Sequence, residues 1–380
     1  MSVAGRRVTG GFSPPPYPYD RLGPVQALAA AHAGGSVDLS VGAPGDPPPP
    51  EVVAALGSSG RERGYPPSVG SPALRDAAVG WMARRVGVEV PVENVAVCVG
   101  TKEFVATLPQ WLRLRDPGRD TVLYPAVSYP TYAMGAVLAG CRAVPVPVDD
   151  RWRLDLSAID DTDAERALCL WVNSPANPTG ALDDLGAAAA WGRAHGVPVF
   201  SDECYVEFTW DGGPRTILEH GLDGLVAAHS LSKRSNLAGL RAGFYAGDAD
   251  LVHYLAEVRK HVGMMMPGPV QAAATVALGD DAHVDRQRAR YRERLTYLAR
   301  VLTAAGYACA LPGGSFYLWP EAPGGDAWAG AEDLARRGGL VTSPGEFYGA
   351  AGAGHLRVAA VVGMDRLRLV ADRLGTHPAG

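Results

Sequence analysis

His229-Ser-Leu-Ser-Lys-Arg-Ser-Asn-Leu-Ala-Gly-Leu-Arg-Ala-Gly243 is the stretch of this 380-residue chain that decides its fold. It continues the apolar run 225–229, which is typical of a buried strand, so Lys233 stands shortly after a strand end. Ligands of open α/β sheets bind at the carboxyl ends of the strands. A lysine reacts with carbonyl groups near neutral pH only if burial or nearby cations lower its pKa, and hydroxyl and guanidinium donors beside it suit a phosphate. Taken alone, the stretch is equally compatible with a solvated basic loop.

Two further segments place polar residues after strand-like runs. Asn173-Ser-Pro-Ala-Asn-Pro-Thr-Gly180 follows the apolar run 168–172, although an ordinary strand-to-helix turn uses the same residue types. In Val199-Phe-Ser-Asp-Glu-Cys-Tyr205, Asp202 ends an apolar strand. A buried carboxylate is costly unless it is paired, and either a salt bridge within the protein or a protonated cofactor ring nitrogen would satisfy it.

The rest of the chain predicts an α/β fold. Between residues 70 and 275, longer helical stretches alternate with short apolar runs, at 95–99, 121–124, 168–172, 197–201 and 225–229. This alternation predicts a mostly parallel central sheet flanked by helices on both faces. Residues 250–305 are expected to be helical, and a smaller α+β unit is expected to follow, with strands at 317–319 and 356–360 and a closing helix at 364–374.

Three regions follow from this pattern. Residues 1–44 are expected to form an N-terminal arm and part of a small domain, with residues 1–24 extended because they are rich in glycine and proline. Residues 45–275 are expected to form the large ligand-binding domain, and 276–380 the small C-terminal domain. The proline run 45–50 is read as the crossing between the two.

Composition excludes several classes of protein. The net charge of −5 argues against a nucleic-acid or anionic-membrane partner, and no apolar run is long enough to span a bilayer. The five cysteines form no C-x-x-C pair, which indicates reduced thiols and a cytoplasmic location. No metal site is expected.

In their order and spacing, these motifs resemble fold-type I enzymes that use pyridoxal 5′-phosphate (PLP), and among them the class I/II aminotransferases with the aspartate-aminotransferase-like fold. The shared pattern is Asn-Pro-x-Gly, then Asp-x-x-Tyr, then Ser-x-Ser-Lys with an arginine eight residues later, and finally an arginine in a late strand. The resemblance covers nearly the whole chain. It implies an enzyme whose substrates are small molecules and which exchanges amino groups between amino acids and keto acids.

The resemblance also implies a role for each matching residue. Lys233 would carry PLP as a Schiff base and move the proton at the substrate Cα. The other cofactor contacts would be made by Asp202 at the ring nitrogen, Asn177 and Tyr205 at the phenolic oxygen, Tyr129 or else Tyr132 stacked on the ring, and Gly100, Thr101, Lys102, Ser230 and Arg241 at the phosphate. Tyr65 would reach the phosphate of a neighbouring subunit, which implies a homodimer with shared active sites.

At the substrate, Arg357 would bind the α-carboxylate through its two-pronged guanidinium, and the backbone of Gly42 would close over it. For Arg357 alone, a surface strand arginine is an equal possibility. Several stretches resemble actinobacterial succinyldiaminopimelate aminotransferases more closely, among them Ser201-Asp-Glu-Cys-Tyr205 and Val258-Arg-Lys-His-Val-Gly-Met-Met-Met-Pro-Gly-Pro-Val-Gln271. The implied reaction passes the amino group of glutamate to N-succinyl-2-amino-6-oxopimelate in lysine biosynthesis.

That acceptor carries a second carboxylate, for which Lys102, Arg234 and donors near a partner's Tyr65 are the candidate ligands. One other function stays open, and two further ones are disfavoured by the sequence. An enzyme of the same fold could catalyse elimination or replacement, because the same electron sink serves these reactions. A PLP-fold sensor module would need a DNA-binding unit, which the proline-rich residues 1–24 cannot form. A dinucleotide dehydrogenase would need a glycine-rich turn between a strand and a helix, and the region 352–354 does not fit that context.

Overall fold

A computed structural model describes residues 11–376 of the chain. Its larger part, here called the large unit, is built on a seven-stranded sheet with the order β2-β8-β7-β6-β5-β3-β4. The strands are β2 (Val95–Cys98), β3 (Thr121–Pro125), β4 (Arg142–Val146), β5 (Ala167–Asn173), β6 (Val199–Asp202), β7 (Leu225–Ser230) and β8 (Gly243–Gly247). The five strands from β4 to β7 in this order are parallel, and β8 is antiparallel to both its neighbours. The predicted mostly parallel sheet is confirmed.

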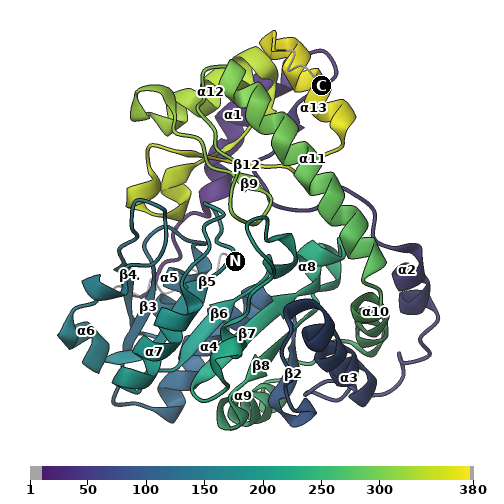
Figure 1. Ribbon diagram of the computed structural model, residues 1–380, viewed down its shortest axis with the longest axis vertical. Helices are drawn as coiled ribbons and strands as arrows, with labels where there is room; N and C mark the ends of the chain where they lie inside the picture. The colour runs from purple at the N-terminus through teal and green to yellow at the C-terminus, as the bar shows by residue number, and fades with distance from the viewer. Residues whose placement is uncertain (1–10, 377–380) are drawn as a thin grey trace, which may run out of the picture.

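Helices cover both faces of this sheet (Figure 1). On one face lie α4 (Thr101–Arg115), α5 (Thr131–Leu138) and α9 (Ala249–His261), and on the other α3 (Pro72–Trp81), α7 (Leu185–His195) and α10 (Gly268–Gly279). All seven residues of β5 are buried, because alternate side chains enter the two cores. The double burial explains why the strands appear in the sequence as unbroken apolar runs.

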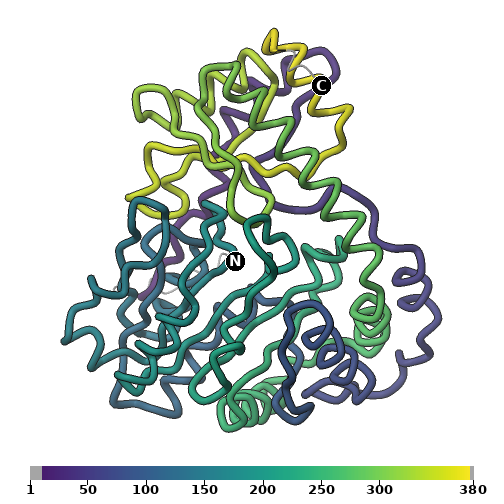
Figure 2. Tube along the Cα trace, viewed as in Figure 1, coloured from purple at the N-terminus to yellow at the C-terminus, as the bar shows by residue number. Residues whose placement is uncertain are grey.

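A second, smaller unit contains both ends of the described chain. Its elements are α1 (Gly23–Ala30), β1 (Val37–Asp38), β9 (Tyr317–Leu318), α12 (Ala327–Gly338), β10 (Leu340–Val341), β11 (Ser343–Pro344), β12 (Leu356–Ala359) and α13 (Met364–Leu374). β1 pairs with β10, while β11, β12 and β9 form a separate antiparallel sheet. Figure 2 shows the purple start of the chain running among the green and yellow segments of this unit. The long helix α11 (Ala282–Ala304) begins beside α10 in the large unit and packs on α13 in the small one (Figure 1).

The N-terminal region differs from the prediction. Residues 11–17 form no helix or strand, but Pro18–Leu22 form a 3-10 helix and α1 begins directly afterwards. The predicted extended arm is therefore wrong from Pro18 onward, and its first ten residues lie outside the described part. Proline at the start of a helical turn has no amide hydrogen to lose and a preset φ, so Pro18 and Pro24 favour helix starts.

Three short elements complete the description. These are α2 (Pro50–Gly57), α6 (Asp161–Glu165) and the single-turn α8 (Leu231–Arg234). All five cysteines are free thiols. Among residues 11–376, no helix is both long enough and apolar enough to cross a membrane.

Candidate active site

A cavity of about 390 Å³ opens where β5, β6 and β7 end, between the large sheet and the small unit. Its walls are formed by Tyr17, Tyr19, Val41, Gly42, Ala43, Thr101, Lys102, Val105, Tyr129, Tyr132, Asn173, Asn177, Asp202, Cys204, Tyr205, Ser230, Ser232, Lys233, Ala238, Arg241, Tyr317 and Arg357. Every predicted site residue except Gly100, Tyr65 and the candidate ligand Arg234 lines it. The carboxyl ends of parallel strands have brought together motifs that are far apart in the sequence.

Lys233 enters the cavity from α8. The helix begins with Ser230, whose Oγ accepts a hydrogen bond from the Ser232 amide at 3.1 Å and so caps the turn. The Lys233 ammonium donates a hydrogen bond to the Gly42 carbonyl oxygen. Burial, assisted by the positive charges of Arg357 and Arg241, lowers the pKa of Lys233 to about 8. A substantial fraction of this lysine is then a neutral amine near physiological pH, as addition to a carbonyl group requires.

Asp202 lies at the end of β6 and faces the same cavity. Its Oδ2 accepts a hydrogen bond from the Tyr132 hydroxyl at 2.9 Å, and its Oδ1 accepts one from the Cys204 amide at 3.2 Å. Burial raises the pKa of Asp202, although both bonds and the charge of Lys233 oppose the rise. Within the described residues it forms no ion pair with a lysine, arginine or histidine side chain. The salt-bridge alternative is thus not met, and a cationic ring nitrogen would suit this carboxylate.

Arg357 forms the opposite wall. It is only 2% exposed, and it donates hydrogen bonds to Asn177 Oδ1 at 2.9 Å, to the Tyr19 hydroxyl at 3.0 Å and to the Ser40 carbonyl oxygen. Its guanidinium carbon lies 4.4 Å from the ring centroid of Tyr317. Burial disfavours the charge, but the surrounding tyrosines outweigh it and raise the pKa of Arg357. This arginine is therefore a fixed positive charge inside the site rather than a surface residue.

Close packing against Tyr205 and Tyr317 explains why position 42 is a glycine. A Cβ on Gly42 would lie 1.9 Å from the Tyr317 hydroxyl oxygen, which itself is 2.8 Å from the hydroxyl of Tyr205. Any larger residue at position 42 would displace this tyrosine pair.

The N-terminus of α4 forms a third wall, with features that suit a phosphate. Gly100 precedes the helix with φ +78°, and a Cβ there would lie 2.2 Å from Arg241 Nη2. Only glycine allows this approach, which brings the Arg241 guanidinium over the first amides of α4. Ser230 and Thr101 add hydroxyl groups. Gly100 does not line the cavity itself, but it determines the shape of this cradle.

The side chain of Lys102 lies at the mouth of the cavity. Its ammonium nitrogen lies 3.4 Å from the Tyr17 hydroxyl oxygen and 5.6 Å from the ring centroid of Tyr129. The exposed ammonium is thus placed among aromatic rings at the entrance.

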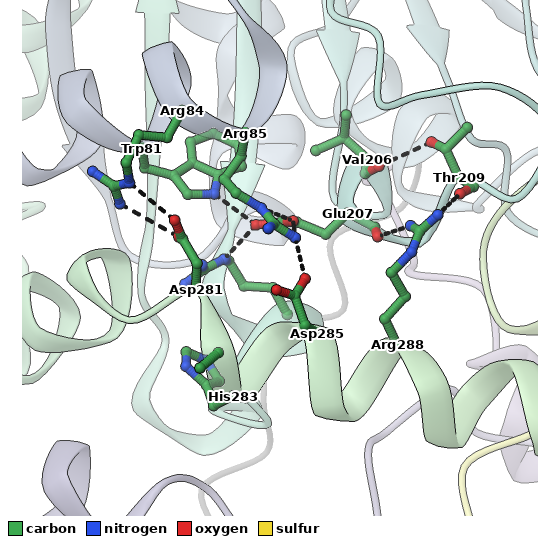
Figure 3. Close-up of polar contacts among 12 residues, drawn as sticks. Trp81, Arg84, Arg85, Val206, Glu207, Thr209, Asp281, His283, Asp285 and Arg288 are labelled. Carbon is green, nitrogen blue, oxygen red and sulfur yellow. Dashed lines mark hydrogen bonds and ion pairs between the residues drawn. The ribbon is translucent and has the colours of Figure 1, made fainter.

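Two of the predicted site residues, Tyr65 and Arg234, do not reach the cavity. Tyr65 is 95% exposed and does not reach the cavity of its own chain. Arg234, a candidate ligand for the far end of the substrate, is buried on the other side of α8, where its Nε lies 3.2 Å from Glu207 Oε1. Figure 3 shows Glu207 also receiving hydrogen bonds from Trp81 and Arg85. The candidate role of Arg234 is therefore wrong.

Several residues of the cavity were missed by the sequence reasoning, namely Tyr17, Tyr19, Ser232, Cys204 and Tyr317. Ser232 and Cys204 stand within quoted motifs, next to assigned residues. The tyrosines lie in the small unit or lead into it, and the Pro/Tyr stretch 13–19 was the only available signal for two of them.

The donor set fits pyridoxal 5′-phosphate. It provides an amine of lowered pKa at Lys233, a buried carboxylate at Asp202 that forms no ion pair within residues 11–376, and a cradle at Gly100 that admits Arg241. A buried, positively charged arginine, Arg357, faces them from β12. These groups match, respectively, an aldehyde, a ring nitrogen, a phosphate and the carboxylate of an amino acid.

Comparisons with known proteins agree with this chemistry. The model of the family "Aminotransferase class I and II" matches residues 35–374. The chain is 43% identical over 368 residues to the 4-dedimethylamino-4-oxo-anhydrotetracycline transaminase OxyQ of Streptomyces rimosus, covering 95% of this chain and 99% of the relative. It is 35% identical to an LL-diaminopimelate aminotransferase of Desulforudis audaxviator, covering 95% of each chain.

Two solved structures are also similar to the chain. An aminotransferase from Neisseria meningitidis superposes with a TM-score of 0.88 and 30% identity, covering 95% of this chain and 97% of the other. A probable N-succinyldiaminopimelate aminotransferase from Thermus thermophilus gives a TM-score of 0.84 and 29% identity, covering 94% and 98%.

Proposed function

The chain belongs to the class I and II aminotransferases, and on that basis we propose that it passes the amino group of glutamate to a keto acid with a second carboxylate. The family depends on PLP, whose electron-poor ring stabilises negative charge at the substrate Cα. One observation carries the proposal: the buried, positively charged Arg357 and the amine of Lys233, with its lowered pKa, share one cavity. The first would hold an α-carboxylate while the second acts at the adjacent carbon.

Lys233 would both bind the cofactor and move the proton at the substrate Cα. A pKa of about 8 lets it give and take a proton near neutral pH, as a general acid–base requires. Its hydrogen bond to the Gly42 carbonyl oxygen directs the amine toward the small-unit wall that would also close over the substrate. Lys233 is thus the residue assigned to proton transfer.

Asp202 and Asn177 would fix the two ends of the cofactor ring. Asp202, whose ionised form is favoured by the hydrogen bonds from Tyr132 and the Cys204 amide, would hold the ring nitrogen protonated. The Asn177 amide oxygen accepts from Arg357, which leaves the amide nitrogen to donate to the ring oxygen, alongside Tyr205. Asn177 would therefore join the cofactor to the carboxylate-binding arginine.

The remaining cofactor contacts are proposed as the sequence predicted them. Tyr129 would stack on the ring, and the phosphate would be held by Gly100, Thr101, Lys102, Ser230 and Arg241. The Tyr132 hydroxyl donates a hydrogen bond to Asp202, which holds the Tyr132 side chain at that carboxylate. This favours Tyr129 over Tyr132 for the stacking role. Tyr65 would contribute from a second copy of the chain, so a homodimer is part of the proposal. The high exposure of Tyr65 supports a role outside its own subunit. The cytoplasmic location stays a prediction.

N-succinyl-2-amino-6-oxopimelate is the acceptor we propose first. The similar structure named a probable N-succinyldiaminopimelate aminotransferase and the relatives named LL-diaminopimelate aminotransferases support a long substrate with carboxylates at both ends. The Lys102 backbone amide at the start of α4 would serve the phosphate, and its exposed ammonium at the cavity mouth would meet the far carboxylate, since Arg234 points away from the cavity.

A second acceptor class is favoured by one observation. Tyr17 and Tyr129 flank the Lys102 ammonium at the entrance, and such aromatic walls suit a ring ketone of the kind named for OxyQ. In that case glutamate would still use Arg357, and the Tyr17 ring, beside the Tyr129 that stacks on the cofactor, would face the ketone.

The test is a panel of amines and ketones followed by cofactor absorbance, after borohydride reduction and peptide mapping have located the labelled lysine. We expect the label on Lys233 and glutamate-dependent amination of the succinylated keto acid. A label on Lys102 or Lys260 would overturn the site assignment. Amination of polycyclic ketones alone would replace the acceptor, and elimination or replacement without amination would replace the reaction while keeping fold and cofactor.

A further inference from the structure

The three residues that follow Lys233 each bind the junction of α10 and α11. Arg234 Nη1 donates to the Ala277 carbonyl oxygen at 2.7 Å, and Ser235 Oγ lies 2.9 Å from His283 Nε2. Asn236 Nδ2 donates to Gln287 Oε1 at 3.2 Å. The reactive lysine is thus the last residue of the cavity wall before a segment anchored to the helix that continues into the small unit.

His283 lies at the centre of this anchor, in a hydrogen-bonded chain of fixed direction. Its Nδ1 is 3.0 Å from Asp280 Oδ2, and the carboxylate can only accept, so Nδ1 carries the proton. Burial lowers the pKa of His283, which keeps the ring neutral and leaves Nε2 as an acceptor. Ser235 therefore donates its hydroxyl proton to His283, and the Ser235 oxygen accepts from Arg234 Nη1 at 3.1 Å. Each group thus donates a hydrogen bond to the next, from Arg234 to Ser235, from Ser235 to His283, and from His283 to Asp280.

This arrangement resembles the serine, histidine and aspartate of a hydrolase, but its surroundings rule that function out. Ser235 is 1% exposed and is absent from the walls of the four best-formed cavities of the described residues. A nucleophile needs access to its substrate, and none exists here. What the chain of bonds can do is hold α8 in place.

Arg234 is held from the opposite side as well. Its Nε donates to Glu207 Oε1 at 3.2 Å. The Glu207 carboxylate also accepts from Trp81 Nε1 at 2.6 Å and from Arg85 Nε at 3.0 Å (Figure 3). Figure 3 also shows Arg288 of α11 reaching the backbone oxygen atoms beside Glu207. A helix of only four residues has little stability of its own, so these outside contacts determine where Lys233 points.

We propose that His283 is a positioning residue for Lys233, acting through its hydrogen bond to Ser235, so that α11 sets the orientation of the reactive amine from outside the cavity. The inference rests on the proposed role of Lys233. Reacting groups displaced by about 1 Å lose on the order of a hundredfold in rate, and a loosened α8 would move the amine by part of that distance.

The experiment compares side chains that replace one imidazole nitrogen each. In His283→Gln the amide oxygen can still accept from Ser235, whereas His283→Asn is too short to do so and keeps only the bond to Asp280. Ser235→Ala removes the same bond from the other side with the smallest change in volume. Arg84→Gln is the matched control, because Arg84 forms an ion pair with Asp281 and donates to the Leu278 carbonyl oxygen at the same junction, and its hydrogen bonds among the described residues go to these two residues rather than to α8.

The readouts are kcat, the pH midpoint of the absorbance of the bound cofactor without substrate, and the thermal midpoint. We expect kcat to fall roughly tenfold in His283→Asn and in Ser235→Ala, and the pH midpoint to shift in both. The double variant His283→Asn/Ser235→Ala should have the same kcat as each single variant, because all three remove the same hydrogen bond. His283→Gln should stay within about threefold of the wild type, and Arg84→Gln should change only the thermal midpoint.

Two results would overturn the proposal. The first is an unchanged kcat and pH midpoint in Ser235→Ala, whatever its thermal midpoint. The second is a His283→Gln variant as impaired as His283→Asn. A borohydride label on a lysine other than Lys233 would instead refute the proposed function, so the two failures are distinguishable.

Discussion

Replacing Arg357 with lysine is expected to raise the KM of every α-amino acid donor by roughly 10- to 150-fold. The guanidinium offers five N–H donors in a rigid plane, and its Nη groups already bind Asn177, Tyr19 and the Ser40 carbonyl oxygen. An ammonium keeps the charge but cannot present two parallel donors to a carboxylate. One lost charged hydrogen bond is worth about 1.5–3 kcal/mol, and each 1.4 kcal/mol is a factor of ten in affinity.

Steady-state kinetics with several amino acid donors would measure this effect, with kcat expected to change much less than KM because the lost contact binds substrate and transition state alike. Arg294→Lys is the control. Arg294 is also buried and binds Asp46 through both Nη atoms, at 2.6 and 2.7 Å, but it does not line the cavity. A KM within twofold of the wild type in Arg357→Lys, or an equal rise in Arg294→Lys, would refute the reasoning.

Three further predictions follow from the same cavity. Asp202→Asn should retain cofactor yet lower kcat by about 10²–10³, the size of one preorganised electrostatic contact, and a kcat near that of the wild type would remove Asp202 from the ring-nitrogen role. Tyr132→Phe should move the acidic limb of the kcat–pH profile to higher pH, because the Tyr132 hydrogen bond lowers the pKa of Asp202; an unmoved limb would contradict this. The rate at which apoenzyme takes up PLP should rise with pH through about 8, because the neutral amine of Lys233 increases as pH passes its lowered pKa; a rise beginning only near pH 10 would show an ordinary lysine.

The large unit could be predicted from the sequence because its strands are buried on both faces. Such strands appear as unbroken apolar runs, and the polar residues at their ends, such as Asp202 and Asn177, mark the cavity directly. The amphipathic closing helix was predicted with the bounds that the structure has, Met364–Leu374.

The small unit's share of the cavity could not be predicted in the same way. Tyr19 and Tyr317 reach the cavity only because β1 pairs with β10 and both chain ends fold together, which no local pattern reports. Arg234 was misjudged for a different reason. Successive residues on a helix lie about 100° apart, so the neighbour of Lys233 points into the protein rather than into the cavity.

The meeting of both chain ends in the small unit has a consequence for synthesis and for evolution. The groups assigned to the cofactor within one subunit lie between Gly100 and Arg241, so they all leave the ribosome before Tyr317 and Arg357 exist. The groups assigned to the substrate are completed last, when β1, which follows the helical turn of Tyr19, can pair with β10, made some three hundred residues later. We therefore expect substitutions in these two terminal segments to change what the enzyme accepts while the residues assigned to its cofactor stay the same.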